Sequence, residues 1–444
     1  MRPNLRPFLA ATAVLASLVM APTAQATFSL TAKPSDRQVA LDWPDVVTSG
    51  FYDVYRDGTW VKYLDTPTSA WTDTGLTNGR TYQYQVKAYR WTTGGGNTFV
   101  DQSNVVSGTP PGEGFGCFAL SSLAAGARPP ACWRPFSDSA PFNVGIPSAP
   151  KLHPNSSNIV AYMMSRGAPA QMQSNDGGYD WEHASYFAKS TDPVYTVHCR
   201  MSWGTCAPEG KQYRIPASAK PAGYLMNDPN ADRHLAVVQP DGVTTLDLWQ
   251  ADTPSGTGGT LGASWGGLVQ INGNGLNSGS TGANFSGFAG AIRGQQLEAG
   301  RINHALFAVT PCTYGYVYPA NKGASECGAT NAPPNGARLQ LNMTSAEISA
   351  LAVPQWKKVI LEALRKYGMI IGDTGGGSIA FGLQFESGMV DRSFGRAEKV
   401  DQYAIAQGVP SWYDPAIGRT LHIFDLAPGV AWASRLRVID PCVC

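Results

Sequence analysis

The sequence lacks several features that would assign it to a common class. After residue 27, no uncharged apolar run approaches the roughly twenty residues that a membrane-spanning helix needs. Charged residues make up only 15% of the chain, with 33 basic and 32 acidic side chains and no basic stripe. A basic stripe is the usual footprint of a nucleic-acid-binding surface. We therefore expect a mature protein that is soluble and that binds neither membranes nor nucleic acid.

The N-terminal residues, by contrast, indicate export. Arg2 and Arg6 precede an apolar run over residues 8–20, and the small residues Ala24-Gln25-Ala26 follow it. A basic start, a short apolar segment and a small-residue cleavage site are typical of a secretory signal peptide. We predict that residues 1–26 are removed and that the mature protein is a secreted monomer.

The eight cysteines of an exported chain are best interpreted as disulfide partners. Local pairing would close three loops, while the two C-terminal cysteines could bridge each other or pair with the first two. The sequence does not choose among these connectivities. No C-x-x-C pair is present, which argues against a zinc site. The local pairs are Cys117 with Cys132, Cys199 with Cys206, and Cys312 with Cys327, and the C-terminal cysteines are Cys442 and Cys444.

Short alternating strands follow the signal segment. Apolar and polar side chains alternate over residues 39–43 and 82–88, and Asp57-Gly58 marks a tight turn between them. Such strands, separated by turn residues, are typical of a β-sandwich. On these residues, the segment 27–110 resembles a fibronectin type III module, which implies a spacer or weak binder without chemistry. Residues 111–116, rich in Pro and Gly, are the predicted linker.

Residues 117–444 are the predicted catalytic or glycan-binding domain. Residues 235–238 and 244–249 have the pattern of two strands joined by a Pro-Asp-Gly turn. Apolar side chains recur at helical spacing between Pro354 and Gly368, which predicts one helix. The many glycines and the aromatic content of 10% favour β-rich structure. We therefore predict a mainly β chain: a fibronectin-like sandwich, then a larger β-sandwich or jelly roll with one packed helix.

Three segments of the larger domain carry a second resemblance. They are Asp232-Arg233-His234, the segment 300–306 (GRINHAL) and the segment 367–373 (YGMIIGD). On these residues, the stretch 225–400 resembles a group of exported bacterial proteins that has no activity attached to it. The resemblance implies a grouping alone, so the chemistry must be inferred from the residues.

Titratable side chains in this stretch are the candidates for catalysis. Asp232 and His234 would project to one face of a strand, about 7 Å apart along the backbone. His304 lies among apolar residues, where a solvated histidine is not expected, and Asp373 ends a predicted strand before a triple-glycine loop. We predict that these four side chains meet in one hollow and act as acids and bases. The alternatives are a surface Asp-His pair and a core histidine.

Aromatic and cationic residues suggest the substrate. The faces of Trp249, Trp265 and Tyr316 could stack on the apolar C–H surface of sugar rings. Paired carboxylates would serve a glycoside hydrolase, whereas His304 with Arg301 or Arg293 would suit a polysaccharide lyase. We therefore predict a secreted enzyme that cleaves a polysaccharide or cell-wall glycan without a cofactor.

Two other functions are compatible with the same residues. The first is a non-catalytic glycan-binding protein or adhesin that uses the aromatic side chains alone. The second is a metal-dependent hydrolase in which Asp228, Asp232 and His234 hold a divalent metal ion.

Overall fold

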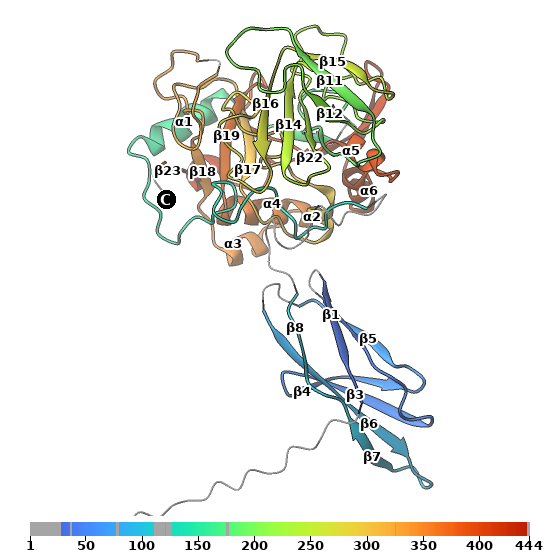
Figure 1. Ribbon diagram of the computed structural model, residues 1–444. Coiled ribbons are helices and arrows are strands. Elements are labelled where there is room, and N and C mark those ends of the chain that lie inside the picture. Colours follow the sequence, from blue (N-terminus) through green and yellow to red (C-terminus); the bar gives the residue numbers. More distant parts are fainter. Residues whose placement is uncertain are drawn as a thin grey trace, which may run out of the picture. The chain divides into compact units, whose positions relative to one another are not determined.

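A computed structural model describes residues 28–35, 38–76, 80–110, 120, 127–174, 177–324 and 326–441. The predicted signal peptide and linker, and Cys117, Cys442 and Cys444, lie outside the described residues. The chain divides into two compact units, Met1–Pro110 and Pro111–Cys444 (Figure 1). Within the described part of the chain, no helix is long and apolar enough to cross a membrane.

The first unit contains two antiparallel sheets. One has the strand order β1-β2-β5, and the other has the order β4-β3-β6-β7, with β8 pairing to β6. Side chains of Trp43, Tyr52 and Tyr84 are buried in a shared core, as the alternating pattern predicts. The strands are β1 (Thr31–Ser35), β2 (Gln38–Asp42), β3 (Gly50–Arg56), β4 (Thr59–Asp65), β5 (Ala70–Thr74), β6 (Tyr82–Trp91), β7 (Asn97–Gln102) and β8 (Val106–Gly108).

The larger unit is built around a five-stranded sheet with the order β20-β17-β19-β18-β23. Alternate residues of β17 belong to different cores, because successive side chains of a strand point to opposite faces. Leu306 and Ala308 belong to the core that contains helix α4 (Gln355–Lys366), whereas Phe307 and Val309 pack against the core of a second sheet. The strands of the central sheet are β17 (Leu306–Thr310), β18 (Arg338–Leu341), β19 (Met369–Thr374), β20 (Gly382–Leu383) and β23 (Leu436–Ile439).

The second sheet has the order β10-β13-β14-β16, so the central sheet lies between this sheet and helix α4 (Figure 1). Two three-stranded sheets, β12-β11-β15 and β21-β22-β9, complete the β structure of the described residues. The strands are β9 (Gln171–Ser174), β10 (Ser185–Phe187), β11 (Val194–Cys199), β12 (Gln212–Arg214), β13 (Leu235–Val238), β14 (Thr244–Trp249), β15 (Gly259–Ala263), β16 (Trp265–Gln270), β21 (Ser411–Asp414) and β22 (Arg419–Asp425).

The predicted helix is α4 (Gln355–Lys366), which buries Trp356, Ile360 and Leu364. It ends before Gly368, whose φ of 75° is the left-handed conformation that suits a helix C-terminus. The prediction of a mainly β fold with a packed helix is confirmed, and the structure adds further short helices. They are α1 (Ser156–Arg166), α2 (Gly294–Glu298), α3 (Ser345–Ala350), α5 (Gly388–Ser393), α6 (Lys399–Ala406) and α7 (Trp432–Arg435).

Two of the predicted disulfides are present. Cys199 bonds to Cys206, and Cys312 bonds to Cys327, each closing one loop of the larger unit. Cys132 is also disulfide-bonded, and its partner lies outside the described residues.

A buried ion cluster joins the start of the larger unit to its C-terminal half. The guanidinium of Arg128 donates hydrogen bonds to the carboxylates of Glu386 and Asp391. All three side chains are at most 5% exposed. Removing charges from water is costly, so each member of such a cluster depends on the others.

Candidate functional site

A pocket of about 410 Å³ lies where the central sheet meets the second sheet. Phe307 and Val309 of β17 and Ala236 of β13 supply part of its apolar wall. Its size is typical of small-molecule sites, in which an apolar lining carries a few polar groups. Its titratable lining residues are Asp180, Glu182, His183, Asp232, His234 and Asp373.

A β-bulge directs Asp373 into this pocket. Ala308 is in register with Ile371, but Val309 is in register with Asp373, so Gly372 is an extra residue in β19. A shift of one residue moves a side chain to the opposite face of a sheet. In a regular strand, Asp373 would share the face of Ile371, which packs in the core of helix α4. The bulge instead places Asp373 beside Val309 on the face of the pocket.

Burial and hydrogen bonding set the state of the Asp373 carboxyl. The backbone N–H groups of Gly282 and Thr374 donate to its two oxygens, at 2.6 Å and 2.9 Å. Burial raises the pKa of Asp373 above its usual range, although the charge of His234 and the two hydrogen bonds oppose this rise. A carboxyl with a raised pKa retains its proton at higher pH, as a general acid must.

Asp232 and His234 meet in the pocket by a route that differs from the predicted one. Both precede β13, which begins at Leu235, so they do not alternate along a strand. Between them, Arg233 has the left-handed φ of 43°, a backbone state that often marks functional sites. The indole N–H of Trp249 donates to Asp232 at 2.9 Å, and Nδ1 of His234 lies 3.1 Å from the Ser280 hydroxyl.

The segment before β10 supplies pocket residues that were not predicted. Nδ1 of His183 donates to the Gly287 carbonyl at 2.6 Å, and burial lowers the pKa of His183 to about 4. Its imidazole is therefore neutral at neutral pH. Asp180 and Glu182 line the same pocket. The sequence signal for this part of the site was the close spacing of Asp180, Glu182 and His183. No strand or motif around them indicated that their side chains face a pocket.

A second pocket of about 290 Å³ adjoins the first, and we call it the tryptophan pocket. Trp249 and Trp265 stand opposite each other on β14 and β16, and the ring of Trp203 lies 5.4 Å from that of Trp249. The Lys322 ammonium lies 5.8 Å from the centre of the Trp265 ring. The predicted stacking residues Trp249 and Trp265 thus line a pocket, together with Trp203 and Lys322, which were not predicted.

The structure separates His304 from the other candidates. His304 is 2% exposed and lines neither pocket. Its Nε2 accepts a hydrogen bond from the Gln296 amide, and its Nδ1 lies 2.9 Å from the Ala305 carbonyl. The expected meeting of His234 and His304 in one hollow is therefore wrong, and His304 is a core histidine with satisfied hydrogen bonds. The segment before β17 turns its imidazole into the interior.

Two predicted substrate-binding residues also lie elsewhere. Arg301 lines neither pocket. Tyr316 is 55% exposed and lies in the loop closed by Cys312 and Cys327, outside both linings. Of the predicted residues, Asp232, His234, Asp373, Trp249 and Trp265 are brought together.

Nor do the proposed metal ligands assemble into a site. In the ranges that the structure describes, no group of three or more His, Cys, Asp or Glu side chains is arranged to hold a metal ion. Asp228 lines neither pocket, so it does not join Asp232 and His234 there.

Burial of His304 predicts a specific pH dependence of stability. Burial lowers the pKa of His304 to about 3, from an ordinary value of 6.5. The neutral imidazole therefore stabilises the fold fully above pH 6.5, and this contribution is lost as the pH falls toward 3. Between pH 6.5 and pH 5, the loss is about 2 kcal/mol, since one pKa unit corresponds to about 1.4 kcal/mol.

Comparison with His304→Gln isolates this contribution, because all other titrating groups are shared. We expect the unfolding free energy of the wild type to fall by about 2 kcal/mol more than that of the variant over this pH interval. Urea denaturation at pH 6.5 and pH 5 measures the difference. Equal pH slopes would show that His304 is not buried in its neutral form.

A substitution at Gly282 tests the position of the Asp373 carboxyl. A Cβ at this position would lie 2.4 Å from Oδ1 of Asp373 and 2.8 Å from the Ala324 Cβ. We expect Gly282→Ala to displace the carboxyl and to lower any catalytic rate that depends on Asp373 about a hundredfold, because small misplacements of reacting groups have large effects. Gly145→Ala is the control, since its nearest neighbour would be 3.7 Å away. Equal rates for the two variants would contradict the assigned geometry.

No protein-family model and no curated protein sequence matches the chain. Parts of it are similar to solved structures. A β-1,2-glucanase from Parabacteroides distasonis is 22% identical, over 21% of this chain and 14% of that chain, with a TM-score of 0.17. A pectate lyase from Erwinia chrysanthemi is 21% identical, over 20% and 30% of the two chains, with a TM-score of 0.16. A family 28 exopolygalacturonase from Yersinia enterocolitica is 14% identical, over 26% and 28%, with a TM-score of 0.17. The matches span less than a third of each of these proteins, and they assign this chain to no family.

Proposed function

We propose that this protein is an exported enzyme whose larger unit hydrolyses glycosidic bonds in a polysaccharide. One observation carries the proposal: Asp232 and Asp373, from distant parts of the chain, both line the boundary between the 410 Å³ pocket and the tryptophan pocket. Two carboxyl groups are the usual machinery of glycoside hydrolysis. Indole faces beside them suit the apolar C–H surface of a sugar ring.

The two carboxyl groups are suited to different roles. Asp373, with its raised pKa, donates a proton to the glycosidic oxygen as the bond between this oxygen and the anomeric carbon breaks. A water molecule forms the new bond to the anomeric carbon, and Asp232 accepts its proton. Proton exchange with solvent then restores both groups. His234 lines the same pocket and lowers the pKa of Asp373, against the larger effect of burial.

Hydrolysis is favoured over lyase chemistry by the position of the arginines. A lyase would need a cation beside the uronate carboxylate, and Arg301 or Arg293 were the candidates. Neither lines either pocket, and Arg293 is buried with its guanidinium 5.1 Å from the ring of Trp133. Among the described residues, the lining of the 410 Å³ pocket contains no arginine or lysine, and the Lys322 ammonium belongs to the adjoining tryptophan pocket. The polar groups of the pocket suit a neutral sugar.

The first unit supports this role without taking part in the chemistry. We propose that it is a fibronectin type III module, because three strands and five strands form two sheets around a common core. A spacer of this kind would hold the enzyme away from a surface or along an insoluble polymer. The two described disulfides agree with an extracellular location, since disulfides persist outside the reducing cytoplasm.

A polysaccharide panel tests the proposed activity. The mature protein is incubated with plant, fungal and bacterial glycans, and products are followed by reducing ends and by absorbance near 235 nm, where unsaturated uronates absorb. We expect new reducing ends without absorbance. Absorbance would indicate a lyase, and binding to insoluble glycan with intact chains would favour the adhesin alternative. An absence of both product and binding would contradict a glycan-directed function.

A further inference from the structure

The tryptophan pocket and the 410 Å³ pocket share part of their lining. Four residues line both pockets: Asp232, Thr281, Asp373 and Thr374. The two carboxyl groups therefore stand at the junction of the pockets rather than at the bottom of one of them. A ligand that contacts both carboxyl groups can extend into either pocket.

Disulfide-closed loops form two walls of the tryptophan pocket. The bond between Cys199 and Cys206 closes the loop that carries Trp203. The bond between Cys312 and Cys327 closes the loop that carries Lys322 and Ala324. The two disulfides whose cysteines are both described thus restrain residues of the same pocket.

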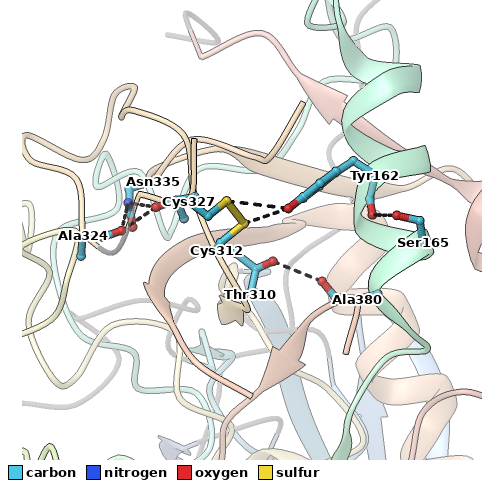
Figure 2. The surroundings of a disulfide bond; sticks show 9 residues. Tyr162, Ser165, Thr310, Cys312, Ala324, Cys327, Asn335 and Ala380 are labelled. Carbon is cyan, nitrogen blue, oxygen red and sulfur yellow. Dashed lines mark hydrogen bonds between the residues drawn. A yellow bond between two sulfur atoms is a disulfide. The ribbon is translucent and has the colours of Figure 1, made fainter. Parts of the chain in front are cut away.

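Further contacts fix the second loop (Figure 2). The hydroxyl of Tyr162, on helix α1, points at the disulfide and lies 2.9 Å from Sγ of Cys312. The Ala324 carbonyl accepts hydrogen bonds from Thr313 at 2.6 Å and from the Asn335 amide at 3.4 Å. The wall that Ala324 provides is therefore held from several directions before any ligand binds.

An exposed aromatic ring on a restrained loop needs an explanation. Trp203 is 59% exposed, although it contacts the Trp249 ring. Restraining a loop in its binding conformation lowers the entropic cost of binding, so the arrangement is suited to a ligand rather than to the core. Lys322, beside the Trp265 face, adds a hydrogen-bond donor of the kind that hydroxyl groups of a sugar accept.

We propose that the tryptophan pocket is a second sugar subsite, which holds the unit on the other side of the bond that is cleaved. This inference rests on the proposed glycosidase function and specifies its substrate class. The substrate is then a chain of at least two neutral sugar units, with the scissile bond over Asp232 and Asp373. One unit occupies the 410 Å³ pocket, and its neighbour stacks on the indoles and contacts Lys322.

Two kinds of substrate distinguish the subsites. An oligosaccharide of the sugar identified by the panel occupies both pockets, whereas the glycosyl fluoride of the same sugar leaves the tryptophan pocket empty, since fluoride is small. The measured quantity is kcat/KM for the oligosaccharide divided by kcat/KM for the fluoride. We expect Trp203→Ala and Trp265→Ala each to lower this ratio about tenfold, because one aromatic contact contributes a free energy of about this size. Trp412→Ala is the matched control, because Trp412 is 46% exposed in the same unit and lines neither pocket.

The outcomes separate the two proposals. The subsite would be overturned if the kcat/KM ratio were the same for Trp203→Ala, Trp265→Ala and the control Trp412→Ala. Cleavage by the wild type would still support the proposed function in that case. A failure of the wild type to bind or cleave any glycan would overturn both. Replacing Cys199 and Cys206 with Ser gives a second measurement, for which we expect a lowered ratio in a folded protein. An unchanged ratio would show that the restrained loop does not serve the subsite.

Discussion

Replacing Asp373 with Asn should lower glycan cleavage by about a thousandfold, the usual scale for loss of a general acid. The Asn side chain has nearly the same shape, but it has no acidic proton to give to the leaving oxygen. The wild-type activity should also decline as the pH rises through the pKa of Asp373, which burial places above the usual carboxyl range. Initial rates on the substrate found in the panel, measured against pH, give both results.

Two controls make this expectation specific. Asp228→Asn changes a neighbouring carboxyl that lines neither pocket, and it should keep activity near that of the wild type. Circular dichroism and thermal unfolding should show that the Asp373→Asn variant is folded. A folded variant that retains a tenth or more of the activity would rule out Asp373 as the acid.

Replacing Arg128 with Met should destabilise the larger unit by roughly 3–5 kcal/mol, because it leaves two buried carboxylates without their cation. Glu386 and Asp391 are each at most 4% exposed, so water cannot take the place of the guanidinium. Guanidinium chloride unfolding, followed by tryptophan fluorescence, measures the loss.

The matched variant combines Arg128→Met with Glu386→Gln and Asp391→Asn. Neutral side chains remove the uncompensated charges, so the triple variant should recover much of the lost stability. If the single and triple variants were equally unstable, the loss would come from packing around Arg128 and not from the buried charges.

Features that depend on local spacing could be predicted from the sequence. Helix α4 follows from apolar residues at helical intervals, and its end follows from Gly368. The two described disulfides join cysteines that are 7 and 15 residues apart, so local pairing was sufficient to find them. The Pro-Asp-Gly turn and the residues after it likewise indicated the strand that carries Trp249.

The candidate site was only partly predictable, because its geometry depends on single irregular residues and long-range packing. The extra residue Gly372 changes the face of the sheet on which Asp373 lies, and no sequence pattern predicts a bulge of this kind. The apolar neighbours of His304 correctly indicated burial but could not tell a core from a pocket. Trp203 and Lys322 lie on loops, whose positions depend on the elements that they contact.

The disulfide-closed walls also determine when the proposed enzyme would become able to bind its substrate. Thiols remain reduced in the cytoplasm and are oxidised after translocation. A precursor that is still inside the producing cell would therefore have both loops untethered, with Trp203 and Lys322 free of their covalent restraint. Oxidation after export would then complete the proposed binding surface, so that affinity for the proposed substrate would develop only after the protein leaves the cytoplasm.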